Sequence, residues 1–87
     1  MTGHPLKGKT ITKLTAGSSH TCALTSDGEM YCWGYNSLGQ IGDGTNITRT
    51  LPVKVQGVLS GKVITDISAR ESSTCAVADA RVYCWGS

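Results

Sequence analysis

Short runs of β-branched, aromatic and small apolar residues alternate with clusters of Gly, Ser, Asn and Asp along this chain of 87 residues. Apolar runs of this length, bounded by residues that favour turns, are typical of β-strands. The pattern therefore predicts an all-β protein with seven strands and almost no helix. We expect these strands at residues 11–16, 20–25, 29–33, 51–55, 63–69, 73–77 and 81–85.

The expected strands follow an internal repeat. The tetrapeptide Tyr-Cys-Trp-Gly occurs at 31–34 and again at 83–86, and Cys22 recurs as Cys75. The offset is 53 positions at the first cysteine but 52 at the tetrapeptide, so the second copy has lost one residue between its two cysteines. Repeats of this length are typical of propellers and other arrays in which one unit cannot bury its apolar surface alone. We assign repeat one to about 6–58 and a partial repeat two, without a fourth strand, to about 59–87.

The cysteine positions restrict the register of each hairpin. In the first repeat, a two-residue loop would place Cys22 and Cys32 on opposite faces of the sheet. A three-residue loop at 26–28, with Gly28 in the left-handed region, places them directly opposite each other, within reach of a disulfide. A two- or four-residue turn centred on residues 79–80 gives the second pair the same geometry. The expected disulfides are Cys22–Cys32 and Cys75–Cys84.

Other states of the four cysteines stay open at this point. Four cysteines allow three connectivities, and free thiols buried in a reducing cytosol are an alternative to any disulfide. Zinc is disfavoured, because its thiolate ligands usually come in close pairs such as C-x-x-C, whereas nine or eight residues separate the members of each pair here. Paired cysteines favour an oxidising, secreted or cell-surface location.

Both faces of each hairpin carry apolar side chains. In the first hairpin, Leu24 and Met30 point to the same side as the cysteines, while Ala23, Tyr31 and Trp33 point to the other side. A sheet of this kind needs cover on both faces. Sheets stacked face to face around an axis meet that need, so the pattern favours the blades of a β-propeller.

A family resemblance supports the same fold. The first repeat reads ITKLTAGSSHTCALTSDGEMYCWGYNSLGQIGDGT, followed by PVKV, and it closely resembles a repeat of the regulator of chromosome condensation family in its bacterial, cysteine-containing form. The resemblance implies antiparallel four-stranded blades in a closed propeller, commonly of seven blades. It also implies a binding scaffold whose partners vary, since nucleotide exchange on a small GTPase, light sensing and inhibition of β-lactamases all use this family.

The family motif assigns structural roles to particular residues. Its glycines would allow tight chain reversals after the third strand, and its Asn, Gln and Asp side chains would satisfy backbone groups of the same loop. The roles fall on His20, Trp33, Gly34, Asn36, Gly39, Gln40, Gly42, Asp43, Gly44, Trp85 and Gly86. We expect the two tryptophans to lie in the core between blades rather than at a partner interface.

The chain shows no catalytic, cofactor-binding or metal-binding motif. The Gly-rich loop lacks the Gly-Lys-Ser/Thr of a phosphate cradle, and Asp43 stands alone where calcium needs several carboxylates. His20 has no Ser, Cys or carboxylate placed to complete a nucleophilic arrangement, so a structural histidine is favoured over a hydrolase. We therefore expect no enzyme activity and no cofactor.

The second repeat departs from the motif in the turn after its first strand. It reads SARESSTC where the first repeat reads TAGSSHTC, so that Arg70 and Glu71 replace Gly17 and Ser18. One interpretation is drift in a tolerant loop. The functional interpretation is that Arg70 and Glu71 project from one rim of the blades and bind a partner, as loops between strands often do.

Charge and length narrow the possible partners. The net charge is only +2, the N-terminal lysines are spaced without aromatic residues, and no apolar run is long enough for a membrane helix. We expect neither nucleic-acid nor membrane binding. With two blades in each chain, we expect a homo-oligomer of three or four copies that closes a ring of six or eight blades, within the propeller range of ~4–8. The alternative function is an inhibitor or exchange-factor module that binds a protein through its rim loops.

Overall fold

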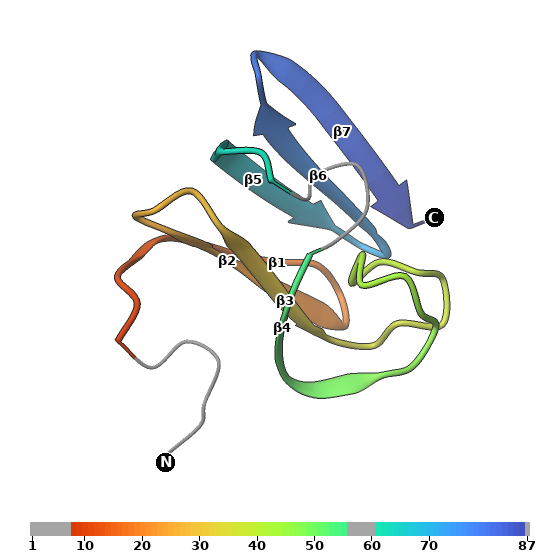
Figure 1. The fold of residues 1–87 in the computed structure, drawn as a ribbon. Helices are drawn as coiled ribbons and strands as arrows, with labels where there is room; N and C mark the ends of the chain where they lie inside the picture. Colours follow the sequence, from red (N-terminus) through yellow and green to blue (C-terminus); the bar gives the residue numbers. More distant parts are fainter. Residues whose placement is uncertain (1–7, 56–60, 87) are drawn as a thin grey trace.

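The computed structural model of the chain describes residues 8–55 and 61–86. They form two antiparallel sheets in seven strands, the number and order that the sequence predicts (Figure 1). Each strand begins and ends within two residues of its expected bounds. The first sheet, blade one, contains β1 (Ile11–Ala16), β2 (His20–Thr25), β3 (Met30–Gly34) and β4 (Arg49–Lys54) in that spatial order. The second, blade two, contains β5 (Ile64–Arg70), β6 (Ser73–Ala78) and β7 (Arg81–Gly86).

The described residues contain no helix, and so none that could cross a membrane. The expected boundary between the repeats, near residues 58 and 59, lies outside the described residues. Blade two has three described strands, and β7 has a neighbour on one side only among residues 61–86. This agrees with a second repeat that lacks its outer strand.

The strand register places each pair of cysteines as the sequence predicts. Cys22 lies opposite Cys32 in the β2–β3 hairpin, and the two are joined by a disulfide with their Cα atoms 4.1 Å apart. The hairpin turns at 26–28, where Gly28 has a φ of 81°. Such a φ is easy for glycine because it has no Cβ. The three-residue loop is thus confirmed.

The second hairpin reaches the same cysteine pairing with a shorter turn. Asp79 and Ala80 form a two-residue turn in which both residues have positive φ, 55° and 61°. Two-residue turns of this kind match the right-handed twist of the strands that they join. Cys75 therefore lies opposite Cys84, to which it is joined by a disulfide. The deletion in the second repeat shortens the turn and leaves the register of the cysteines unchanged.

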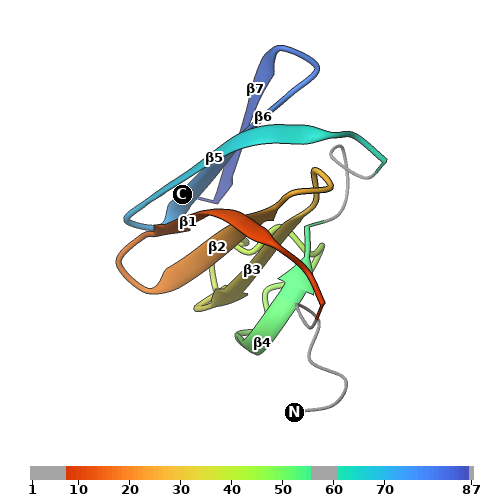
Figure 2. The same cartoon turned by 90° about the vertical axis from the view of Figure 1, so that its left-hand side faces the viewer.

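The two blades pack face to face, as Figure 2 shows. We call the side of each sheet that carries the disulfide its back face, and the side that carries Ala23 in blade one and Ala76 in blade two its front face. The back face of blade one covers the front face of blade two, and the core lies between them. Its buried side chains are Cys22, Leu24, Met30, Cys32, Ile41, Val55, Ile64, Ile67, Ala76 and Ala78, with Val53, Tyr83 and Trp85 packed against them.

Candidate functional site

Backbone hydrogen bonds and one hydroxyl join the inner strands of the two blades. The Ala69 N–H donates to Thr15 Oγ1 at 3.1 Å, and the Ser18 N–H donates to the carbonyl of Glu71 at 3.0 Å. Near the opposite rim, the Ile64 N–H donates to the carbonyl of Gly28. The interface is therefore fixed along its length by directional contacts in addition to apolar packing.

The loop between β3 and β4 is organised by two buried polar side chains. Asn36 is fully buried; its amide donates to the carbonyls of Thr45 and Ile47, and its Oδ1 accepts from the N–H of Ile41. Asp43 accepts hydrogen bonds from Thr45 and from Arg49 Nε at 2.7 Å. Burial alone would raise the pKa of Asp43, but these hydrogen bonds outweigh it and the pKa is lowered.

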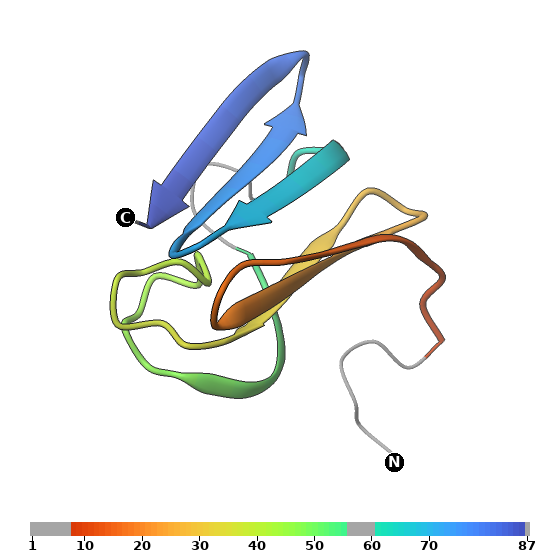
Figure 3. The same ribbon diagram turned by 180° about the vertical axis from the view of Figure 1, so that it is seen from behind.

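This loop contacts blade two through the main chain of Gln40. The Gln40 carbonyl accepts a hydrogen bond from the Thr74 hydroxyl at 2.6 Å and another from Trp85 Nε1 at 2.9 Å. Figure 3 shows the loop lying against the end of β7. The approach needs glycine at position 42, because a Cβ there would lie 2.7 Å from Trp85 Nε1. The Gln40 side chain stays within the loop, where its Oε1 accepts from the Leu38 N–H.

His20 extends this contact from blade one. Its Nε2 lies 2.8 Å from Thr74 Oγ1. Because the Thr74 hydroxyl donates its proton to the Gln40 carbonyl, the hydroxyl oxygen must accept from His20 Nε2–H, and this fixes the tautomer. Nδ1 is then an acceptor, buried without a partner among the described residues. Burial lowers the pKa of His20, against a smaller opposing effect of the Ser73 backbone.

The pair of His20 and Thr74 has the composition of a base and a hydroxyl nucleophile, but its position argues against catalysis. Thr74 is 0% exposed and His20 is 3% exposed. The hydroxyl proton already goes to a backbone carbonyl. Sequence reasoning missed Thr74 as the partner, because it lies in the other repeat, 54 positions away. No local pattern around His20 indicates it.

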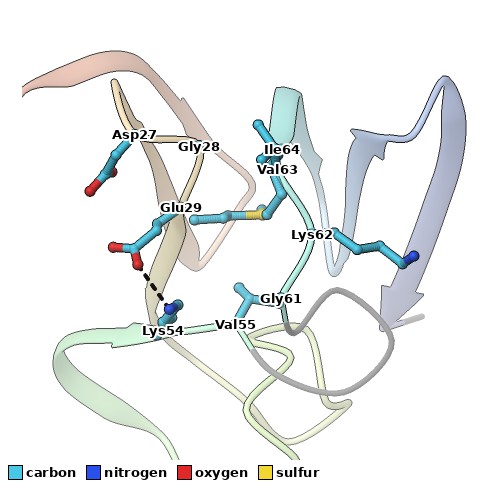
Figure 4. Close-up of a pocket in the computed structure, with 10 residues that line it drawn as sticks. Asp27, Gly28, Glu29, Lys54, Val55, Gly61, Lys62, Val63 and Ile64 are labelled. Atoms are coloured by element: carbon cyan, nitrogen blue, oxygen red, sulfur yellow. Dashed lines mark hydrogen bonds and ion pairs between the residues drawn. The ribbon is translucent and has the colours of Figure 1, made fainter.

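A cavity of about 200 Å³ opens at the opposite rim, between the β2–β3 turn and the start of β5 (Figure 4). Its floor is apolar, with Met30, Val55 and Ile64, and its edge carries Glu29 and Lys54, which form an ion pair at 2.9 Å. The remaining lining residues are Asp27, Gly28, Gly61, Lys62 and Val63.

The charges around this cavity are already paired. Glu29 accepts from Lys9 at 2.6 Å as well as from Lys54, and the Tyr31 hydroxyl also donates to it. These hydrogen bonds, that from Lys9 most of all, lower the pKa of Glu29 to about 2. Asp27 pairs with Lys9 at 3.0 Å. The Lys62 ammonium pairs with Asp79 at 2.8 Å. The charged groups that line the cavity therefore have partners within the protein, and we assign no ligand to it.

Arg70 and Glu71, the candidate partner-binding residues, lie at the rim that also carries the β3–β4 loop. Both are exposed. Glu71 has a φ of 47°, which is uncommon for a residue with a side chain, and its carbonyl is the acceptor for Ser18. The turn thus uses its backbone for blade packing and leaves the two charged side chains in solvent.

Two faces of the molecule have no second sheet packed against them among the described residues. On the front face of blade one, Leu14 is 62% exposed, whereas Ala23 and Tyr31 in the same row are buried. On the back face of blade two, Val82 is 70% exposed and Cys84 is exposed. The two tryptophans differ accordingly: Trp85 packs against the core between the blades, whereas Trp33 lies on the uncovered front face. Trp85 therefore lies between the two described blades, whereas no described blade lies against Trp33.

Comparison with known proteins places these blades among characterised repeats. Residues 11–40 and residues 27–77 each match the regulator of chromosome condensation (RCC1) repeat. The chain is 41% identical over 83 residues to the human E3 ubiquitin-protein ligase HERC2, covering 93% of the chain but 2% of that protein. It is 39% identical over 82 residues to the Ultraviolet-B receptor UVR8 of Arabidopsis thaliana, covering 93% of the chain and 18% of that protein.

Solved structures show the same arrangement of blades. Human WBSCR16 superposes with a TM-score of 0.84 and 28% identity, over 87% of this chain and 19% of that chain. Prp20p of Saccharomyces cerevisiae, whose structure was reported with its binding to Gsp1p and histones, superposes with a TM-score of 0.72 and 27% identity, again over 87% and 19%. The chain therefore spans a small part of each protein that it resembles.

Proposed function

Because the chain belongs to the regulator of chromosome condensation repeat family, we propose that it is a non-catalytic propeller module that acts as a structural or protein-interaction scaffold. One observation carries the proposal: the molecule packs one blade on another around an apolar core, and within the described residues one face of each blade has exposed apolar side chains on it. Exposed faces of this kind mark sites of contact with further protein. The buried positions of His20 and Thr74 support a structural role for this pair, which resembles a catalytic dyad in composition.

We extend the proposal to self-association into a ring. Two blades per chain give six blades from three copies or eight from four, both within the usual propeller range of ~4–8 blades. The exposed faces on opposite sides of the molecule support a head-to-tail contact, because only such a contact repeats around a closed ring. Light scattering after gel filtration tests it. A species of three or four times 9.1 kDa is expected, and a monodisperse 9.1 kDa species with a cooperative thermal transition would contradict it.

A second candidate function is the binding of a protein partner at the rim. The observation that favours it is the exposed turn at Arg70 and Glu71. Prp20p binds Gsp1p and histones, so these are the defined partners to try. We expect binding to be lost in the double variant Arg70→Ala/Glu71→Ala and kept in Arg81→Ala, an exposed residue at the opposite rim. Equal binding by both variants would contradict a role for this turn.

The cysteines support a proposal about the location of the protein. Both disulfides of the structure are compatible with an oxidising environment outside the cell. We propose a secreted or cell-surface protein. Recovery of the chain with four free thiols from its native source would overturn this, whereas two intact disulfides would support it.

A further inference from the structure

The loop between β3 and β4 carries a three-residue motif that the scaffold function does not use. Asn46-Ile47-Thr48 has the form Asn-X-Ser/Thr, with a residue other than proline in the middle. This is the acceptor sequence for N-linked oligosaccharides in proteins that pass through a eukaryotic secretory route. It occurs once in the sequence, because the other asparagine, Asn36, is followed two positions later by Leu38 rather than by serine or threonine.

The two asparagines of this loop have opposite surroundings. Asn36 is 0% exposed, and its amide nitrogen donates to the carbonyls of Thr45 and Ile47. Asn46 is exposed, as are Ile47 and Thr48. The loop thus uses Asn36 to hold its shape, and the asparagine of the motif is the one that a large group can reach.

Asn46 makes one side-chain hydrogen bond among the described residues. Its Nδ2 donates to the carbonyl of Ser37 at 2.9 Å. A primary amide nitrogen carries two protons, and attachment of a sugar replaces one of them. One N–H therefore remains on Nδ2 as a donor after modification, so the loop can keep its fold with a sugar on Asn46.

Exposed apolar side chains flank the motif. Leu38 is 51% exposed and Ile47 is 59% exposed. Leu38 follows Ser37 and Ile47 follows Asn46, so the two apolar side chains are next to the residues that the hydrogen bond joins. An oligosaccharide is bulky and strongly hydrated. On Asn46 it would cover apolar surface that the described part of the protein leaves in solvent.

The position of the motif leaves the blades free to pack. Residues 46–48 lie in the β3–β4 loop and outside every strand of the two sheets. A group attached to Asn46 is therefore on a rim loop and not on the face of a sheet. Modification at this position is compatible with the contact between the two blades and with the proposed ring.

We propose that Asn46 is an acceptor for an N-linked oligosaccharide. In the transfer, a C–N bond forms between Asn46 Nδ2 and the anomeric carbon of the sugar, and the bond from that carbon to a lipid-linked diphosphate breaks. The amide nitrogen loses one proton, and the diphosphate leaves as the anion. The Thr48 hydroxyl completes the motif that the transferring enzyme recognises. The proposal rests on the proposed secreted location, because a chain meets the lipid-linked donor only in a secretory route.

The test maps Asn46 and the cysteines in one sample. The full chain is recovered from its native source and digested without reduction, and its peptides are measured by mass spectrometry before and after treatment with an amidase that releases N-linked sugars. Release should leave aspartate in place of Asn46. Two intact disulfides with an unmodified Asn46 would overturn the acceptor site and leave the secreted location standing. Four free thiols with an unmodified Asn46 would overturn both.

Variants at position 48 separate the motif from the fold. No side-chain hydrogen bond of Thr48 is present within residues 8–55 and 61–86, so Thr48→Ala should unfold at the same urea concentration as wild type when both are made without sugar. In the cells that modify the wild type, Thr48→Ser should keep the sugar and Thr48→Ala should lose it. A sugar that persists on Asn46 in Thr48→Ala, or one that is lost in Thr48→Ser as completely as in Thr48→Ala, would contradict the assignment.

Discussion

The two blades share strand order, register and a cross-strand disulfide, yet they differ in what surrounds them. Cys22 and Cys32 are 0% exposed between the blades, whereas Cys84 is exposed and Cys75 is half-buried on the outer side of blade two. Ile67 is 2% exposed and its counterpart Leu14 is 62% exposed. The repeat sequence therefore determines the geometry of a blade, and the neighbouring blade determines which of its residues form a core.

The largest effect expected from this difference concerns Ile67 and Leu14. Ile67→Ala leaves a cavity between the blades and should lower the free energy of unfolding by about 2–4 kcal/mol, whereas Leu14→Ala at the uncovered position should change it by less than about 0.5 kcal/mol. Urea unfolding followed by tryptophan fluorescence measures both. Ile67→Ala could unfold so small a domain. Ile67→Val is therefore a milder second variant, with an expected loss of about 0.5–1.5 kcal/mol in the free energy of unfolding. Equal losses at the two positions would contradict the packing of blade one on blade two.

The disulfides give the next comparison. Reduction of Cys22–Cys32 requires the blades to separate, because a reductant cannot reach a fully buried bond, whereas Cys75–Cys84 is open to solvent. We expect brief treatment with a phosphine reductant to open the second bond and spare the first. Alkylation followed by peptide mapping identifies the freed cysteines. Loss of both bonds at the same rate would show that the blades do not stay packed.

The strands and disulfides could be predicted from the sequence because they depend on neighbours along the chain. Turn length, the left-handed glycine at position 28 and the alternation of apolar residues are all local signals. The contacts between blades could not be predicted in the same way. The Gln40 carbonyl has no side-chain signature, and Thr74 meets His20 from 54 positions away. The sequence also does not distinguish the surroundings of Trp33 and Trp85, since both tryptophans occur in the same motif and only their neighbours differ.

The charges at the two hairpin turns should have a smaller effect on the free energy of unfolding. Both blades pair a lysine with the turn aspartate, Lys9 with Asp27 and Lys62 with Asp79. Only blade one adds Glu29, at the position that is Arg81 in blade two. Glu29→Gln should lower the free energy of unfolding by about 0.5–1 kcal/mol at neutral pH. The effect is small because water screens a partly exposed ion pair.

The pKa of Glu29 sets the pH range of that contribution. The folded value of about 2 is below the ordinary 4.5, so the stabilisation is present above pH 4.5 and is lost as the pH falls towards 2. Thermal unfolding between pH 7 and pH 2.5 measures it, with Arg81→Gln as the matched variant of blade two. If the difference in melting temperature between wild type and Glu29→Gln stayed the same across this pH range, the stabilising role of ionised Glu29 would be wrong.

The smallest effect concerns His20, whose counterpart in blade two is Ser73. Burial lowers the pKa of His20 below its ordinary 6.5, so the unfolded chain takes up a proton first as the pH falls. Stability should therefore be constant above about pH 6.5 and should decline below it, and the decline should be smaller in His20→Gln. Urea unfolding at pH 7.5 and pH 5.5 compares the two proteins. Identical pH dependence would contradict a buried neutral histidine at this interface.

Indole hydrogen exchange in the unmodified chain tests the difference between the blades most directly. The NMR spectrum should show two indole N–H signals, one from each blade. The account predicts that Trp85 exchanges slowly, because its N–H is bonded to the Gln40 carbonyl within the interface, and that Trp33 exchanges much faster. Exchange of Trp85 as fast as that of Trp33 would contradict the packing of the two blades.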